Sequence, residues 1–161
     1  MIPFYKHNLA DKNYLKKTIK SFYLTSGPRC LEVEELLKKE FLKKSAYLTN
    51  SWTNAVISLL LALNIKKGDE VIIPACTFVA CANVVEMVGG KVIFADINPD
   101  TKLMDIEDCL KKITKKTKAI MPVHLYGNLF PTHKLRNKLK KKIAIIEDSA
   151  HAFCGEYNGK K

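Results

Sequence analysis

The stretch EVIIPACTFVACANVVEMVGGKVIFA, residues 70–95, decides the fold. Its apolar run at 70–73 predicts a buried strand, and residues 77–88 carry apolar side chains at helical spacing. The pair Gly89-Gly90 ends the helix, and a second apolar run at 91–95 predicts another strand. A strand, a helix and a strand in this order form the unit from which parallel sheets are built.

The same alternation continues toward the C-terminus. A helix is predicted at 106–113, a strand at 118–123, a helix at 133–140 and a strand at 143–147. Strands that alternate with helices specify a mostly parallel sheet with helices on both faces. The predicted fold class is therefore α/β, a three-layer α/β/α sandwich.

The residues before this sheet begin with an arm, predicted at 1–30, and residues 31–161 are predicted to form the large α/β domain. Within that domain, apolar residues at helical spacing predict an amphipathic helix at 33–41. The short run at 46–49 is predicted to be a first strand. The apolar stretch at 55–63 is predicted to be a helix that is buried on all sides.

The composition is that of an ordinary globular protein. The 161 residues are 47% hydrophobic and 27% charged, which excludes a disordered or collagen-like chain. The longest mostly apolar run, at 55–63, is far shorter than the roughly 20 residues that cross a bilayer. Residues 1–10 lack the apolar segment of a secretory signal, so a cytoplasmic protein is expected. Its five scattered cysteines are expected to be reduced and mostly buried.

The charge balance raises the question of nucleic acid. Twenty-seven Lys and Arg against 16 Asp and Glu give a net charge of +11. Only Arg29 and Arg136 are arginines, and the basic stretch at 109–146 holds few aromatic residues, whereas readers of bases and phosphates rely on both. A solvated, lysine-rich surface is favoured, and a basic α/β binding module is kept as a less favoured alternative.

Polar segments follow the predicted strands, and in open parallel sheets ligands bind beyond the carboxyl ends of the strands. Residues 49–54, TNSWTN, bring hydroxyls and amides to the start of a helix. A helix N-terminus favours phosphate because its N–H groups are free and the helix dipole is positive there. The alternative is that Ser51 or Thr53 acts only as the N-cap of the helix.

Other strand ends add an aromatic ring and a carboxylate. Phe78 follows the strand of the opening stretch, although most aromatic residues at such a turn belong to the core. Asp96 either caps a loop or faces the site. Asp148 and His151 lie at the tip of the last strand, where a carboxylate is costly unless it meets a cation or hydrogen-bond donors.

Several chemistries compete for these positions. A zinc site built from Asp148, His151 and Cys154 lacks paired ligand spacing. The Gly-x-Ser-x-Gly elbow of hydrolases and the Gly-x-Gly-x-x-Gly turn of dinucleotide folds are both absent from the sequence. A phosphate site, a flat ring and a carboxylate fit a phosphorylated aromatic cofactor better, and pyridoxal phosphate (PLP) needs these three contacts.

A series of motifs covers nearly the whole chain. In order they are IP at 2–3, LTSGP at 24–28, NSWT at 50–53, KGDEVIIP at 67–74, TFVA at 77–80, AN at 82–83, GKVIFAD at 90–96, TKAIMPVHLYG at 117–127 and IIEDSAHA at 145–152. Their order and spacing resemble the N-terminal part of the DegT/DnrJ/StrS sugar aminotransferases. The resemblance implies part of the large domain of the aspartate-aminotransferase-like PLP fold.

The resemblance also implies roles for the matching residues. Asp148 would pair with the pyridinium nitrogen of PLP and keep it protonated, so that the ring acts as an electron sink. Phe78 would stack on the ring. Thr53, with the backbone N–H groups of Trp52 and Thr53, would hold the phosphate. His151 occupies a position whose side chain lies near the phenolic oxygen of the cofactor.

Substrate-side contacts are expected from Thr25 and Ser26 and from His124 and Tyr126. Trp52 departs from the family, which usually has a small residue at this position. Its bulky ring either narrows the phosphate pocket or points away and contacts substrate.

By the same resemblance, the reaction moves an amino group, from glutamate, to a nucleotide-linked keto sugar, in a homodimer with sites shared between subunits. A related class uses the pocket for sugar dehydration. The Schiff-base lysine of the family lies beyond the segment that matches 147–151, and the chain ends before it. No catalytic residue is therefore assigned, and the chain alone is expected to be inactive. The alternative is a non-catalytic remnant of a split or truncated gene.

Overall fold

The computed structural model describes residues 12–21, 23, 25–157 and 159. The chain divides into two compact units, and the division falls between Leu48 and Thr49. The motif at 2–3 and the first residue of the motif at 24–28 lie outside the described residues. The predicted division into an arm of 1–30 and a large domain of 31–161 stays a prediction.

The described part of the first unit contains two helices, α1 (Lys12–Ile19) and α2 (Pro28–Glu40). A proline in the first turn favours the start of α2, because its missing N–H would have no partner there. The predicted amphipathic helix at 33–41 is confirmed, and it begins five residues earlier, at Pro28. Its apolar face stays uncovered within the described part of this unit, and Leu31 and Leu36 are exposed.

The predicted strand at 46–49 is wrong. These residues follow α2 without pairing to any strand among the described residues, and the backbone N–H of Leu48 donates instead to Glu34 Oε1 at 2.9 Å. A four-residue run offers no strand by itself, because a strand exists only where a neighbour supplies hydrogen bonds.

The second unit is built on a parallel sheet whose strand order is β2-β1-β3-β4. The strands are β1 (Glu70–Pro74), β2 (Lys91–Ala95), β3 (Thr117–Ile120) and β4 (Ala144–Ile145). All three pairings are parallel, as the alternation of strands and helices predicts. A parallel bridge between Val123 and Asp148 extends the β3–β4 pairing toward the carboxyl edge of the sheet.

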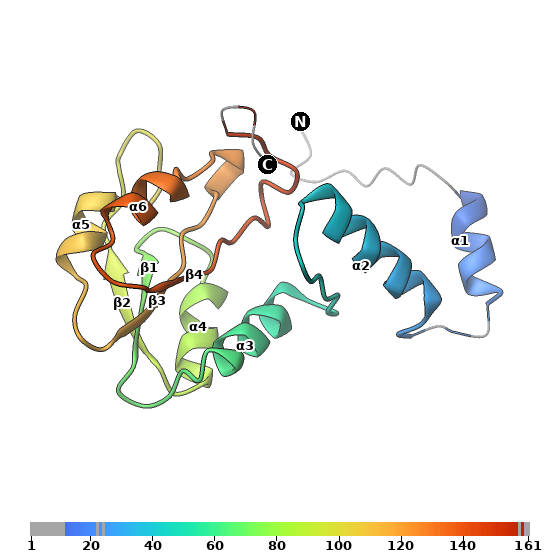
Figure 1. The fold of residues 1–161 in the computed structure, drawn as a ribbon, viewed down its shortest axis with the longest axis horizontal. Helices are drawn as coiled ribbons and strands as arrows, with labels where there is room; N and C mark the ends of the chain where they lie inside the picture. Colours follow the sequence, from blue (N-terminus) through green and yellow to red (C-terminus); the bar gives the residue numbers. More distant parts are fainter. Residues whose placement is uncertain (1–11, 22, 24, 158, 160–161) are drawn as a thin grey trace, which may run out of the picture. The chain divides into compact units, whose positions relative to one another are not determined.

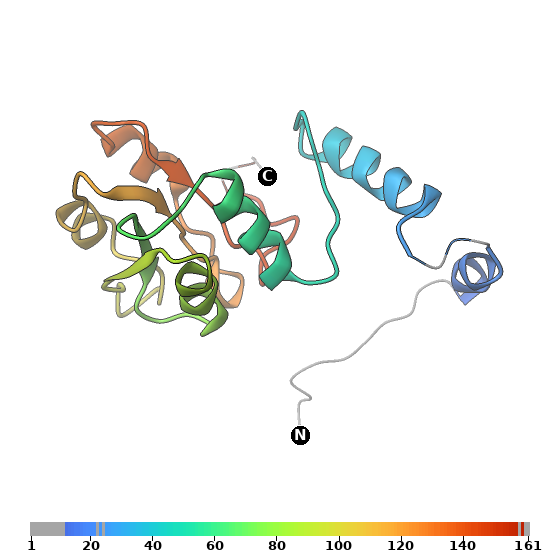
Figure 2. The same ribbon diagram turned by 90° about the horizontal axis from the view of Figure 1, so that it is seen from below.

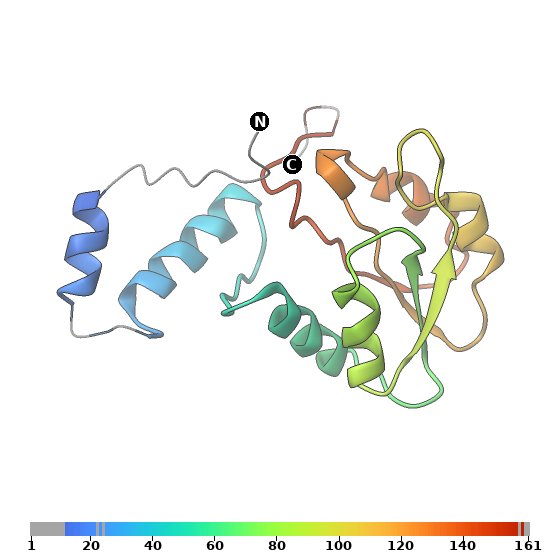
Figure 3. The same ribbon diagram turned by 180° about the vertical axis from the view of Figure 1, so that it is seen from behind.

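Helices cover the sheet on both faces, which confirms the α/β class (Figure 1). They are α3 (Trp52–Ala62), α4 (Ala80–Met87), α5 (Ile106–Lys111) and α6 (Thr132–Lys138), with a short 3₁₀ turn, η1 (Leu125–Gly127). On one face α3 packs against α4, which packs on β1 and β2 (Figures 2 and 3). On the other face lie α5 and α6, which are joined by the ion pair between Glu107 and Lys138.

Burial is deepest along β1, whose five residues are all buried between its two neighbours. The prediction that the helix at 55–63 is buried on all sides is wrong. Only Val56 and Leu60 of α3 are buried, and the next residue, Leu61, is 60% exposed. Within the described part of this unit, α3 packs on α4 with one face. The run at 55–63 therefore carries more apolar side chains than this unit buries.

Lysines gather at the amino edge of the sheet, where all four strands begin. They are Lys66, Lys67, Lys91, Lys115, Lys116, Lys118, Lys140, Lys141 and Lys142, and each is exposed. Backbone contacts make this edge continuous: Glu70 N donates to Lys116 O at 2.9 Å, and Lys91 N donates to Asp69 O at 2.8 Å. The predicted solvated lysine surface thus has a location, which we call the lysine edge.

Two further expectations concern cysteines and membranes. All five cysteines are free, but only Cys81 and Cys109 are buried, so the prediction of mostly buried thiols is wrong. Cys76 and Cys154 lie in exposed loops after strands. Among the described residues, no helix combines the length and apolar character needed to cross a bilayer.

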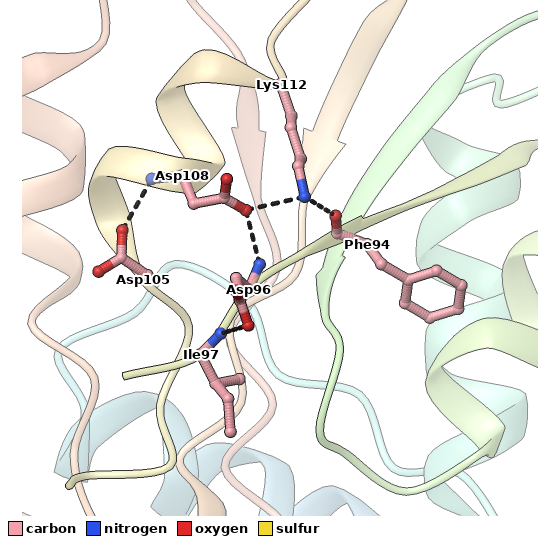
Figure 4. A network of polar contacts seen from close by, with 6 residues as sticks. All are labelled: Phe94, Asp96, Ile97, Asp105, Asp108 and Lys112. Carbon is pink, nitrogen blue, oxygen red and sulfur yellow. Dashed lines mark hydrogen bonds and ion pairs between the residues drawn. The ribbon is translucent and has the colours of Figure 1, made fainter. Parts of the chain in front are cut away.

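A polar network fixes the loop from β2 to α5 (Figure 4). Asp108 Oδ2 accepts from the backbone N–H of Asp96 at 2.7 Å and pairs with Lys112 Nζ at 2.8 Å. Asp105 caps α5 through the N–H of Asp108 at 2.7 Å. Asp96 Oδ1 accepts from the N–H of Ile97 at 2.8 Å, and Asp96 does not line the pocket described below. Of its two predicted roles, the structure gives Asp96 the loop-capping one.

We expect Asp108→Asn to remove a pH-dependent part of the stability. The hydrogen bond from Asp96 N–H and the contact with Lys112 lower the pKa of Asp108 below its ordinary value of 3.8. A carboxylate with a lowered pKa stabilises the fold above the ordinary value and loses this contribution as the pH falls below it. The midpoint temperature of thermal unfolding should therefore fall less steeply between pH 7 and pH 3 in the variant than in wild type. Asp100→Asn, in the exposed loop before α5, is the control, and an equal slope in Asp108→Asn and wild type would contradict the expectation.

Candidate functional site

A cavity of about 250 Å³ lies at the carboxyl edge of the sheet. This volume is close to the lower end of the roughly 300–1,000 Å³ typical of small-molecule sites. The lining residues are Trp52, Thr53, Thr77, Phe78, Cys81, Val123, Leu125, Asp148, Ala150 and His151. The cavity therefore brings together all five residues predicted to contact the cofactor, from segments separated by up to about a hundred positions. Their individual roles stay predictions.

The start of α3 forms one wall. Ser51 is the N-cap, and its Oγ accepts from the N–H of Asn54 at 3.2 Å. Of the two caps that the sequence left open, Ser51 takes this role, which leaves the half-buried Thr53 in the first turn beside the cavity. The positive end of the helix dipole thus faces a site that a hydroxyl also lines.

Asp148 also lines the cavity, and only 7% of its surface is exposed. Its backbone is fixed by two hydrogen bonds, from its N–H to Pro122 O and from His124 N–H to its own carbonyl, both 3.0 Å long. Its carboxylate accepts from Ala150 N–H at Oδ1 (3.0 Å) and from Cys81 Sγ at Oδ2 (3.7 Å). Within the described part of the chain, it forms an ion pair with no lysine or arginine, so its burial is compensated by hydrogen-bond donors alone.

Phe78 stands at the mouth of the cavity with 71% of its surface exposed. It is therefore not a core residue, although most aromatic residues at such turns belong to the core. A ring that contributes little to the core yet lines a cavity is available to pack on a flat ligand.

His151 and Tyr126 form the rim. The backbone N–H of Tyr126 donates to His151 Nδ1 at 3.3 Å, and the two rings stack with centroids 6.1 Å apart. Tyr126 has φ = +55°, in the left-handed region that is rare for residues other than glycine. Such strain gathers at functional sites, and it holds a 73% exposed ring beside a residue that lines the cavity.

His124 is buried and lies outside the cavity lining. Its Nδ1 accepts from the N–H of Phe130 at 2.9 Å, and its Nε2 lies 3.3 Å from Glu147 Oε2. Both ring nitrogens are thus engaged within the chain, which joins the segment after β3 to the segment after β4. Thr25 and Ser26 are exposed residues of the other unit, and their predicted substrate role stays a prediction.

Sequence reasoning missed Cys81 and Thr77 as site residues. They are four positions apart, and Thr77 Oγ1 lies 3.3 Å from Cys81 Sγ. The spacing alone gave a weak signal, because a lone buried cysteine is most often a small apolar core residue. No group of three or more potential metal ligands occurs in the described residues, so nothing in the described structure supports the zinc alternative.

Comparison with known proteins places this geometry in a class and then in a family. The parallel sheet with a cavity at its carboxyl edge has the fold of B. subtilis NtdA, which was solved with bound pyridoxamine phosphate (PMP). That structure covers 87% of this chain at 38% identity with a TM-score of 0.81, and 32% of NtdA is covered. The class is the aminotransferase fold. The chain belongs to the DegT/DnrJ/EryC1/StrS aminotransferase family, which it matches over residues 7–161.

Curated relatives give the same result. GDP-perosamine synthase of Vibrio cholerae is 37% identical over 100% of this chain and 45% of its own length. The 3-oxo-glucose-6-phosphate:glutamate aminotransferase of Bacillus subtilis is 38% identical over 88% of this chain and 32% of its own length. The predicted family is confirmed, and the chain spans less than half the length of the curated relatives it matches.

We expect Ser51→Ala to destabilise the second unit by about 1 kcal/mol, because α3 loses its N-cap. The measurement is urea unfolding followed by circular dichroism. Ser58→Ala is the matched control: Ser58 lies inside the same helix and its hydroxyl donates to Asn54 O at 2.8 Å, so its removal should be neutral or slightly stabilising. Equal effects of the two substitutions would show that the cap does not hold the start of the helix.

Proposed function

We propose that the cavity binds PLP and PMP, and that the protein carrying this segment transfers an amino group from glutamate to a nucleotide-linked keto sugar. The observation that carries the proposal is the buried Asp148 carboxylate in a cavity that also contains an exposed aromatic ring and a helix N-terminus. Family membership and the names of the two relatives support the reaction type and the donor.

The groups that line the cavity fit such a cofactor. A carboxylate without an ion-pair partner among the described residues suits a protonated ring nitrogen, which supplies the missing positive charge. The first turn of α3 suits a phosphate, and Phe78 suits the face of an aromatic ring. Each of the three parts of the cofactor thus has a matching wall.

When bound, PLP supplies an electron sink for the carbon that carries the transferred amino group. Asp148 would hold the proton at the ring nitrogen. Thr53 and the backbone N–H groups of Trp52 and Thr53 would bind the phosphate, with the Trp52 ring beside them. Phe78 would cover one ring face and exclude water, and His151 would lie near the phenolic oxygen.

Substrate and assembly belong to the same proposal. The donor is glutamate, the acceptor is a nucleotide-linked keto sugar, and the assembly is a homodimer that shares its sites between subunits. Tyr126, Thr25 and Ser26 are proposed substrate contacts. His124 is proposed to act on the substrate side indirectly. Its ring nitrogens are engaged with Phe130 and Glu147, so it positions the segments after β3 and β4.

We expect Asp148→Asn to weaken PMP binding at least about tenfold, because loss of a buried charge-assisted hydrogen bond costs on the order of 1.5–3 kcal/mol. PMP is the probe because it forms no Schiff base with the protein. Equilibrium dialysis gives the affinity, and circular dichroism checks that the fold is kept. Unchanged affinity in this variant would remove Asp148 from the site.

A second prediction uses two exposed phenylalanines. Phe78→Ala should lower PMP affinity several-fold and leave the free energy of unfolding within about 0.5 kcal/mol of wild type, as at most surface positions. Phe94→Ala is the matched control, since Phe94 is a half-exposed residue of β2 outside the cavity lining. Equal PMP affinity in both variants would contradict the stacking role.

The reaction itself is tested in the protein that carries this segment, with glutamate and a nucleotide-linked keto sugar, because the segment alone is expected to be inactive. Transamination yields 2-oxoglutarate and an amino sugar in equal amounts. Dehydration, the reaction of the related class, yields a deoxy sugar that carries no amino group. Mass spectrometry of the sugar product separates the two, and a product of the second kind would replace the proposed reaction by dehydration.

A further inference from the structure

Three side chains form a line that ends at the buried carboxylate. Thr77 Oγ1 lies 3.3 Å from Cys81 Sγ, and Cys81 Sγ lies 3.7 Å from Asp148 Oδ2. Cys81 is only 1% exposed and lines the cavity. The thiol thus contacts the one carboxylate that lines the cavity, from a residue that lies 67 positions earlier in the chain.

The direction of these hydrogen bonds follows from the protons available. An ionised carboxylate only accepts, so the single S–H proton of Cys81 goes to Asp148 Oδ2. The Thr77 hydroxyl is then the donor to the sulfur. Burial, together with the nearby Asp148, raises the pKa of the Cys81 thiol to about 11, so the thiol keeps its proton at neutral pH.

The other oxygen of Asp148 has its own donor, the backbone N–H of Ala150 at 3.0 Å from Oδ1. Two donors on two different oxygens fix the plane of the carboxylate, whereas a single donor leaves it free to rotate. The Ala150 donor belongs to the loop after β4, and the Cys81 donor belongs to α4. The orientation of the carboxylate therefore depends on how α4 packs.

We propose that Cys81 is a positioning residue: its S–H group fixes the Asp148 carboxylate in the orientation that binds the ring nitrogen of the cofactor. This inference rests on the proposed function. Because the thiol is a weak donor, it orients the carboxylate without neutralising much of its charge. The full charge stays available to the ring nitrogen.

The contact is tested first without any cofactor. The difference between the infrared spectra of wild type and Cys81→Ala isolates the S–H stretching band of Cys81. We expect this band to move to higher frequency in Asp148→Ala, because the acceptor is lost. A band that stays in place would overturn the inference.

The role is tested with PMP as the probe and a double-mutant cycle. Cys81→Ala should lower PMP affinity about fivefold, the effect of one lost hydrogen bond. It should have little further effect in an Asp148→Asn background, because the two residues act as one unit. Cys81→Ser keeps a donor at this position and should restore affinity to within about twofold of wild type.

Cys109→Ala is the matched control. Cys109 is equally buried, and burial raises the pKa of its thiol to about 12, but it lies in α5 outside the cavity lining. Its removal should leave PMP affinity unchanged.

The outcomes separate this inference from the proposed function. If wild type binds PMP and Asp148→Asn weakens binding while Cys81→Ala does not, only the role of Cys81 is overturned. An equal loss from Cys81→Ala in both backgrounds would mean that the thiol acts by packing, which also overturns the inference. If wild type binds no PMP, both proposals fail together.

Discussion

The parallel pairing of β1 with both of its neighbours is the constraint on which the site depends. Glu70 aligns with Lys91 on one side and with Thr117 on the other, so these three strands start together and run in the same direction. The segments that leave β1, β3 and β4 at the carboxyl edge therefore line one cavity, whereas no residue of the segment after β2 lines it. This is how the chain places an aromatic ring and a carboxylate around one cavity, to which the start of α3 adds a helix N-terminus.

The sheet could be predicted from the sequence because its inner strands are short apolar runs between glycines and polar turns. The failures concern features that depend on neighbours. The run at 46–49 looks like a strand but has no partner among the described residues. The run at 55–63 is apolar apart from Ser58, although only Val56 and Leu60 of α3 are buried. A pattern of apolar residues records what a segment could bury, and the tertiary structure decides what it does bury.

The residues of the candidate site also divide into those that the sequence predicts and those that depend on tertiary neighbours. Asp148, Phe78 and Thr53 could be predicted because each follows a strand or starts a helix at the edge where ligands bind. Cys81 could not, because its chemistry depends on a carboxylate that is distant in sequence and close in space. His124 shows the converse: its place after a strand suggested ligand contact, and the fold uses both ring nitrogens to join two loops.

The lysine edge and the cavity lie at opposite ends of the same strands. This arrangement gives the second unit an electrical polarity, with most of its excess positive charge at the end remote from the cavity. A negatively charged support, such as a cation-exchange resin, would capture this unit by the lysine edge. Within this unit, the cavity would then lie at the end of the strands that points away from the support.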